Sequence, residues 1–145
     1  MTADEEYMTL CIELAKKAAE KGECPVGAIV VDKDGRIIGE GYNMREAEQM
    51  PTAHAEIIAI EQAAKAMNSW RLTECTLYVT LEPCCHYGKT PPCTDIIIES
   101  GIKRVFIGSA DPNPLVAGKG AEKLRSNGIE VIEGVLKDEC DKIND

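Results

Sequence analysis

The sequence predicts an α/β fold, a three-layer α/β/α sandwich around a five-stranded mixed sheet. Two observations lead to this expectation. Short runs of β-branched and apolar residues alternate along the chain with longer segments of helical periodicity. The first two apolar runs are separated only by a tight turn, whereas helices separate the later ones, so an opening hairpin is followed by strand-helix-strand crossovers.

Length and composition predict a single domain spanning residues 1–145. At 44% hydrophobic and 28% charged residues, the chain is typical of globular proteins. No apolar run approaches the ~20 residues that span a bilayer, and the first residues are acidic and polar, so we expect no membrane segment, no leader peptide and a cytoplasmic location. The net charge of −9 argues against a general polyanion binder, although a small phosphorylated substrate needs only a few local cations.

The first part of the chain predicts a helix and a hairpin. Helical spacing runs from Glu5 to Lys21, and Gly22 after it is a typical helix stop. Val26–Val31 is short, β-branched and almost entirely apolar, as is typical of a central strand buried on both faces. The turn sequence 32–35 leads into a second strand at 36–42, which predicts a hairpin. Three glycines here allow either a close approach of backbone or ligand, or simply tight packing: Gly27, Gly39 and Gly41.

The rest of the chain alternates helices and strands. After a polar loop, Thr52 is expected to cap a helix that carries His54 and Glu56 in its first turn. The core-facing residues of this helix are expected to be Ile57, Ile60, Ala64 and Met67. Further strands are predicted at 75–81, 105–107 and 129–132, and further helices at 94–100, 121–127 and 137–145.

Residue types that bind metals are concentrated in two segments, 51–56 and 82–93. These segments hold both histidines of the chain, His54 and His86. They also hold three of its seven cysteines, Cys84, Cys85 and Cys93. An odd number of cysteines without a regular framework indicates reduced thiols or metal ligands rather than disulfides. Because catalytic zinc sites keep three protein ligands and an open position for water, we expect one Zn²⁺ per chain, held by His54, Cys84 and Cys93.

Glu56 is expected to be the catalytic residue. It lies two residues from His54, too close in sequence to be a comfortable fourth ligand but well placed to handle a proton beside the metal. Zinc deaminases divide the work in this way, and their signature is H-x-E followed by P-C-x-x-C. The first half of that signature is present at 54–56. The reaction class that it indicates is hydrolytic deamination.

The second half of the signature is altered. Tyr87 stands where the second cysteine would fall, and the next cysteine along the chain is Cys93. Cys85 is a poor substitute, because two adjacent residues can hardly both point at one tetrahedral metal. His86 stays open as a ligand on spacing alone. The pair Cys84 and Cys93 is the interpretation we favour.

The segment 83–93, Pro-Cys-Cys-His-Tyr-Gly-Lys-Thr-Pro-Pro-Cys, closely resembles the deaminase domain of the bifunctional riboflavin-biosynthesis deaminase/reductase. In that family the loop between the two cysteine ligands is longer. The resemblance continues through 101–105, 111–120 and 128–131, and thus covers nearly all of the second half of the chain. The family usually has Ser where this chain has Cys85.

The first half of the chain looks more like bacterial tRNA adenosine deaminases. This resemblance is carried by 23–28, 41–43, 51–57 and the Ser-Trp-Arg-Leu run at 69–72. Both families are zinc-dependent deaminases of one superfamily, so both halves imply the same cytidine deaminase-like fold and reaction class. They differ in the substrate that they imply.

The second-half resemblance favours deamination of diaminohydroxyphosphoribosylaminopyrimidine. Lys89 lies between the cysteine ligands, and Gly118-Lys119-Gly120 precedes a helix, so Lys89 and Lys119 are candidate contacts for a phosphate. By resemblance to the tRNA enzymes, Asn43 is expected to hydrogen-bond the edge of the ring, and a turn-forming Asn is the alternative. Ala55 and His86 complete the expected substrate contacts.

Other functions stay open. A tRNA adenosine deaminase, or a deaminase of a free nucleobase or nucleoside such as guanine, cytosine or cytidine, fits the same catalytic motif, although the acidic balance disfavours a nucleic acid partner. A purely structural zinc module belongs to a different class, but it would leave Glu56 without a role. By resemblance we expect a homo-oligomer, dimer or tetramer. The chain shows no reductase half, so a separate reductase is expected to act next in riboflavin synthesis.

Overall fold

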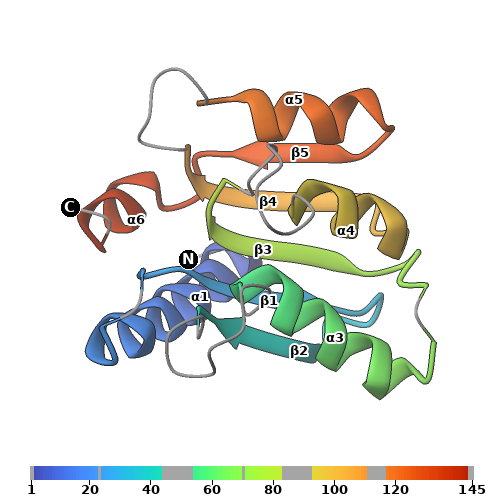
Figure 1. Ribbon diagram of the computed structural model, residues 1–145, viewed down its shortest axis with the longest axis horizontal. Helices are drawn as coiled ribbons and strands as arrows, with labels where there is room; N and C mark the ends of the chain where they lie inside the picture. Colours follow the sequence, from blue (N-terminus) through green and yellow to red (C-terminus); the bar gives the residue numbers. More distant parts are fainter. Residues whose placement is uncertain are drawn as a thin grey trace.

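A computed structural model describes residues 2–22, 24–43, 54–69, 71–82, 93–110 and 117–143. The elements within these ranges are labelled as in Figure 1. In chain order they are α1 (Ala3–Glu20), β1 (Gly27–Val31), β2 (Ile37–Tyr42), α3 (Ala55–Met67), β3 (Thr76–Leu81), α4 (Cys93–Ser100), β4 (Arg104–Ser109), α5 (Lys119–Ser126), β5 (Glu130–Glu133) and α6 (Lys137–Ile143).

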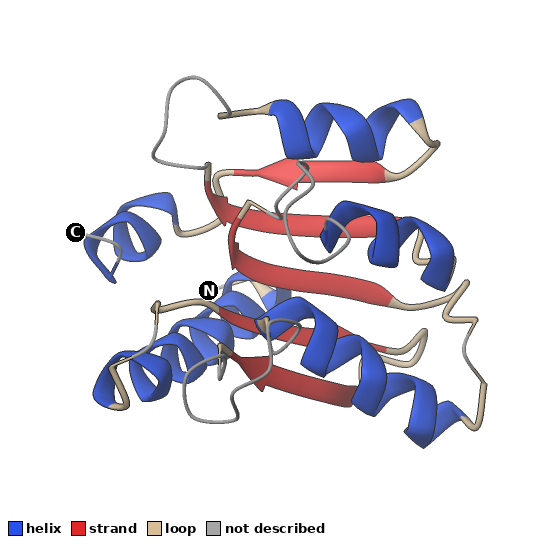
Figure 2. Cartoon of the chain, viewed as in Figure 1, coloured by secondary structure: helices blue, strands red, loops and turns tan. Residues whose placement is uncertain are grey.

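The strands form one mixed sheet in the order β2-β1-β3-β4-β5. β1 pairs antiparallel with both β2 and β3, while β3-β4 and β4-β5 are parallel pairs. Figure 2 shows the five strands with helices packed against the sheet. The predicted hairpin and crossovers are confirmed, and with them the five-stranded mixed sheet.

Helices cover both faces of this sheet, as the sequence predicts. Residues from α3, α4 and α5 share one hydrophobic cluster with Ala28 and Val30 of β1. Residues from α1 and α6 share a second cluster with Ile29 and Val31. Alternate residues of β1 therefore face opposite layers, which explains why this strand is apolar throughout. In Figure 1, α3, α4 and α5 lie in front of the sheet and α1 lies behind it.

The three hairpin glycines are needed for packing between helix and strand. A Cβ atom on Gly27 would lie 2.0 Å from the carbonyl oxygen of Cys11 in α1. On the other face, a Cβ atom on Gly39 would lie 2.1 Å from the carbonyl oxygen of Ala59 in α3. A Cβ on Gly41 would lie 2.7 Å from the carbonyl oxygen of α3's first residue. These glycines bring both helices against the hairpin, and thereby place the start of α3.

Gly39→Ala is expected to lower the free energy of unfolding by about 1–3 kcal/mol, because α3 must move away from β2 to make room for the methyl group. Glu40→Ala is the matched control, since Glu40 is the next residue of the same strand and is exposed. The control should change stability by less than about 0.5 kcal/mol. Urea unfolding of both variants tests the prediction, and equal midpoints would contradict it.

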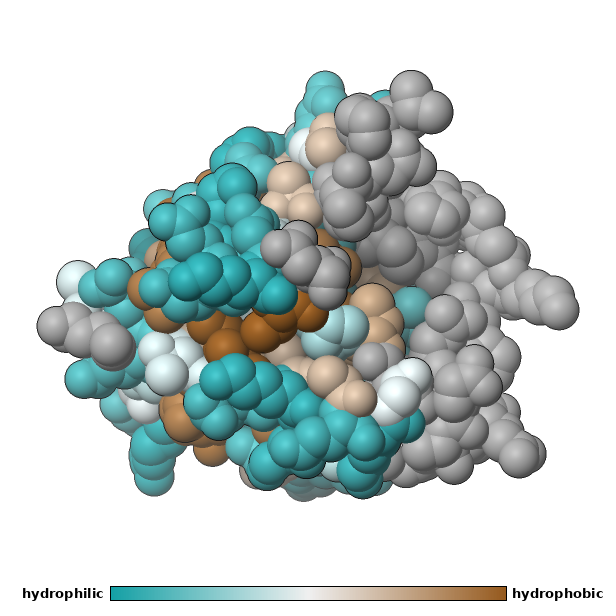
Figure 3. All heavy atoms as spheres, turned by 90° about the vertical axis from the view of Figure 1, so that its left-hand side faces the viewer, coloured by the Kyte–Doolittle hydropathy of each residue, from teal (hydrophilic) through white to brown (hydrophobic). Residues whose placement is uncertain are grey.

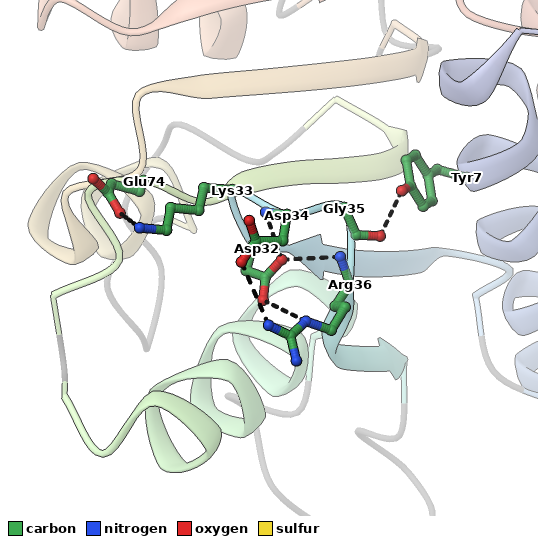
Figure 4. Close-up of polar contacts among 7 residues, drawn as sticks. All are labelled: Tyr7, Asp32, Lys33, Asp34, Gly35, Arg36 and Glu74. Carbon is green, nitrogen blue, oxygen red and sulfur yellow. Dashed lines mark hydrogen bonds and ion pairs between the residues drawn. The ribbon is translucent and has the colours of Figure 1, made fainter.

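The β1-β2 turn is ordered by its own side chains. Asp32 Oδ1 accepts hydrogen bonds from the backbone N–H groups of Asp34 and Arg36, both at 2.9 Å. The Tyr7 hydroxyl donates to the carbonyl oxygen of Gly35 at 2.6 Å, and so links α1 to the turn. Figure 4 shows these contacts together with the exposed ion pair between Lys33 and Glu74. β2 runs from this turn toward Asn43, so the turn lies at the far end of the hairpin from that residue.

Two expectations about α3 are wrong. The helix begins at Ala55 with His54 as its N-cap, so His54 precedes the first turn. Thr52, the expected cap, lies outside the described residues. Met67 is 44% exposed and is not part of the core, because it is the last residue of α3 before Asn68 ends the helix in a left-handed conformation.

A groove of about 330 Å³ runs between α1 and α6 on the second face and is lined in part by Ile12, Leu136 and Ile143. Figure 3 views the molecule from the left-hand side of Figure 1 and shows hydrophobic surface with polar surface above and below it. In the described part of the chain, no helix has both the length and the apolar content needed to cross a membrane.

Candidate active site

His54, Glu56 and Cys93 come together at the carboxyl edge of the sheet. One possible ligand atom from each residue lies within 4.8 Å of those of the other two. His54 is partly buried, whereas Glu56 is 4% exposed and Cys93 is 1% exposed. Cys93 therefore lies beside His54 and Glu56 although it is far from them in the sequence. Of the predicted site residues that the structure describes, these three are the ones that it joins in a cluster.

Two helix starts create this arrangement. His54 is the N-cap of α3, Glu56 lies in its first turn, and Cys93 is the first residue of α4. Figure 1 shows both helices beginning near the edge where β3 and β4 end. Helix N-termini carry a partial positive charge, which stabilises carboxylates and thiolates. The fold thus provides a site that favours anionic ligands.

The residues present fit a zinc ion. An imidazole nitrogen and a cysteine sulfur are the donor types that zinc prefers, and the buried carboxylate beside them can either bind the metal or hold a proton. Cys84, the expected third ligand, lies outside the described residues, as do Cys85, His86 and Lys89. Their roles therefore stay predictions.

Thr94 adds a feature that the sequence did not indicate. Its side-chain oxygen is buried, and within the described residues it has no hydrogen-bond partner. Buried hydroxyl groups normally have one. Thr94 directly follows Cys93 at the start of α4.

The side chain of Asn43 contacts the first residue of α3. Its side chain is 6% exposed, and its carboxamide oxygen accepts a hydrogen bond from the backbone N–H of Ala55 at 2.8 Å. This bond fixes the orientation of the carboxamide, so its NH₂ group is the part that remains as a donor. Asn43 therefore has a structural role in placing α3. The same bond engages the backbone N–H of Ala55, and the expected contact of Ala55 with a substrate stays a prediction.

Lys119 is exposed and is the first residue of α5. The sequence makes Lys119 a candidate phosphate contact at this helix start, where backbone amides could also bind an anion, but two of these amides already have a partner. The N–H groups of Gly118 and Ala121 donate to the carboxylate of Glu82, at 2.9 and 3.0 Å. The predicted anion site is thereby narrowed to the Lys119 ammonium and the N–H groups of Lys119 and Gly120.

Glu82 is a residue that the sequence reasoning missed. It is buried, with 5% of its surface exposed, and it directly follows β3. Its partners lie 36 and 39 residues away in the chain, so no local pattern indicates them. The only available signal was the placement of an acidic residue two positions before the first expected cysteine ligand, Cys84.

Comparisons with known proteins agree with this geometry. A family model described as the cytidine and deoxycytidylate deaminase zinc-binding region matches residues 1–109. The chain is 49% identical over 142 residues to the riboflavin biosynthesis protein RibD of Actinobacillus pleuropneumoniae, covering 97% of this chain and 35% of that protein. It is 44% identical over 144 residues to the tRNA-specific adenosine deaminase of Bacillus subtilis (strain 168), covering 97% of this chain and 85% of that protein.

A solved structure from Thermotoga maritima, a diaminohydroxyphosphoribosylaminopyrimidine deaminase/5-amino-6-(5-phosphoribosylamino)uracil reductase, superposes with a TM-score of 0.81 at 52% identity. The match covers 97% of this chain and 39% of that one. The chain thus spans about a third of the length of its RibD relative and most of the length of the tRNA deaminase. It belongs to the cytidine and deoxycytidylate deaminase zinc-binding family.

Proposed function

We propose that the chain catalyses zinc-dependent hydrolytic deamination of a phosphoribosylated aminopyrimidine, the diaminohydroxyphosphoribosylaminopyrimidine of riboflavin biosynthesis. The observation that carries the reaction class is the convergence of His54, Glu56 and Cys93 within 4.8 Å, with the carboxylate almost fully buried. A structural zinc module would have no use for a buried carboxylate that is not needed as a ligand.

In this proposal each described residue has a distinct task. His54 and Cys93 hold the metal together with Cys84, and the chemistry that a bound zinc supplies is the activation of water. Glu56 takes a proton from the attacking water and delivers it to the ring nitrogen, then takes the remaining proton of the hydroxyl group added to the ring and delivers it to the amino group, which leaves as ammonia. Because Glu56 is 4% exposed, bulk water does not compete for the same proton. The NH₂ group of Asn43 donates to the edge of the ring.

The substrate is inferred from two features. Over almost the whole chain, the identity is 49% to the RibD protein of Actinobacillus pleuropneumoniae and 52% to the Thermotoga maritima deaminase/reductase. The segment 83–93 also has the long spacing between cysteines that resembles the riboflavin family. It places Lys89 between the two expected ligands, and Lys119 begins α5 at the same edge of the sheet. Two lysines are enough to neutralise one phosphate monoester, even in a chain with a net charge of −9.

A tRNA adenosine deaminase is the second candidate. The observation in its favour is that the chain matches 85% of the length of the Bacillus subtilis enzyme, at 44% identity. The sequence pI of about 4.8 is against it, because a protein that binds an RNA stem-loop needs clustered cations to neutralise phosphates. We therefore place this function second.

A substrate panel tests the proposal. Ammonia release should be fastest with the phosphoribosyl pyrimidine, and at least about tenfold slower with its dephosphorylated form, because one charge-assisted contact to phosphate is then missing. Cytidine, cytosine, guanine, adenosine and an adenosine-containing tRNA anticodon stem-loop complete the panel. The Glu56→Gln variant serves as the blank for contaminating activity. Turnover of the RNA without turnover of the phosphoribosyl compound would reject the first candidate in favour of the second.

The assembly and the metabolic partners are part of the same proposal. We expect the chain to be cytoplasmic and to form a homo-oligomer. An apolar groove of about 540 Å³ between α3 and α4, lined in part by Ile60, Ala64 and Ile96, is surface that a second copy would bury. Light scattering of the purified chain measures its oligomeric state, and a monomer mass would refute the expected homo-oligomer.

A reductase, on another protein or on a further part of a longer polypeptide, would consume the product.

A further inference from the structure

Glu82 joins three elements at the edge of the sheet where the candidate active site lies. Its backbone N–H donates to the carbonyl oxygen of Ser109, the last residue of β4, at 2.8 Å. Its two carboxylate oxygens accept hydrogen bonds from Gly118 and Ala121 at the start of α5. One buried residue therefore fixes the ends of β3 and β4 relative to the first turn of α5.

The helix start that Glu82 holds has no cap of its own. Gly118 is the N-cap of α5, adopts a φ of 85°, and has no side chain that could accept a hydrogen bond. Ala121 is the third helical residue, whose N–H an N-cap side chain ordinarily binds. Glu82, which directly follows β3, accepts the hydrogen bond from this N–H in place of an N-cap side chain. Its negative charge is also stabilised by the partial positive charge at the start of the helix. Lys119 lies between the two N–H groups that Glu82 binds.

On the other side, Glu82 leads into the segment of the expected cysteine ligands. Leu81 pairs with Ser109 in the parallel ladder, so the end of β3 is held against β4. Ser109 Oγ in turn donates to Asp141 Oδ1 of α6 at 2.6 Å. The strand end before Cys84 is thus supported by β4 and α6, while the Glu82 side chain reaches across to α5. This carboxylate therefore connects the helix start that carries Lys119 to the strand end that precedes the expected cysteine ligands.

We propose that Glu82 is a positioning residue, whose carboxylate sets the placement of Lys119 relative to the metal ligands and so determines the preference for a phosphorylated substrate. The inference rests on the proposed function, in which Lys119 contacts the substrate phosphate. A side chain that only capped α5 would affect stability alone. A positioning residue must also alter how the enzyme distinguishes the phosphorylated compound from its dephosphorylated form.

Glu82→Gln tests this in the full chain. The carboxamide has nearly the same size, but it can accept only one of the two hydrogen bonds and presents a donor to the other N–H. We expect KM for the phosphoribosyl pyrimidine to rise about tenfold, with kcat within about twofold of wild type, which matches the loss of one charge-assisted contact. KM for the dephosphorylated compound and the zinc content should not change.

A double-mutant cycle separates positioning from a general loss of order. Lys119→Ala should lower the preference for the phosphorylated substrate, and adding Glu82→Gln should lower it no further, because both changes act through the same ammonium group. Glu82→Asp keeps the charge on a side chain one methylene shorter and replaces Glu82→Gln if that variant does not fold. Its preference should lie between those of wild type and Lys119→Ala.

Thr2→Ala is the matched control. Thr2 caps α1 by accepting a hydrogen bond from the N–H of Glu5 at 3.2 Å, on the opposite face of the sheet. Loss of this cap should lower the melting temperature and leave the phosphate preference unchanged. A wild-type preference in the Glu82 variants, or a further loss in the Lys119→Ala background, overturns the positioning role and leaves the proposed function standing. A wild-type enzyme that does not prefer the phosphorylated compound overturns the proposed function, and this inference with it.

Discussion

The Glu56→Gln enzyme is expected to bind zinc as the wild type does and to deaminate its substrate about 10²- to 10⁴-fold more slowly, which is the usual contribution of a general acid-base group. Glu56 lies in the first turn of α3, 4% exposed and within 4.8 Å of the donor atoms of His54 and Cys93. The carboxamide of Gln fills the same space but cannot take up or release a proton. The loss should therefore appear in kcat, with KM little changed.

The control for this variant lies on the same helix. Glu61 is exposed on α3, so Glu61→Gln removes the same charge without touching the cluster, and its kcat should equal that of wild type. Zinc content, measured by atomic emission, distinguishes the two roles that the geometry allows for Glu56. If Glu56→Gln loses its zinc, the carboxylate is a ligand, and the proton must be handled by another group.

The fold could be predicted because the patterns that carry it are local. The apolar run at β1 indicated a strand buried on both faces, and the two hydrophobic clusters confirm this. The turn after it and the periodicity of α1 were also readable from adjacent residues. The start of α3 was less readable, because a capping sequence at Thr52 competed with the true N-cap at His54.

The candidate site was predictable only in part. His54, Glu56 and Cys93 could be grouped because few residue types bind metals and these occur in two short segments. The structure brings the three together, since α3 and α4 begin at the same edge of the sheet. Contacts that depend on tertiary structure gave no such signal. The bonds from Glu82 to α5 and from Asn43 to Ala55 join residues that only the folded sheet places side by side.

Cys93→Ala is expected to lower the zinc content to less than about one tenth of an ion per chain and to abolish deamination, because two remaining ligands do not hold a catalytic zinc. Cys75→Ala is the matched control. Cys75 is also almost fully buried, at 3% exposure, and burial raises the pKa of its thiol, but it precedes β3 at the opposite edge of the sheet from His54 and Cys93. Its zinc content should equal that of wild type.

Zinc content also decides whether Cys84 or His86 is the third ligand, which the sequence left open. Cys84→Ala should lose zinc as completely as Cys93→Ala, whereas His86→Ala should retain it. Retention of zinc by Cys84→Ala together with its loss from His86→Ala would mean that His86 is the third ligand. The site would then hold two imidazoles and one thiolate. Since a neutral imidazole replaces an anionic thiolate in that set, the metal would carry one more net positive charge and bind a phosphate-bearing substrate by stronger electrostatic attraction. The ligand set therefore bears on the substrate as well as on the metal.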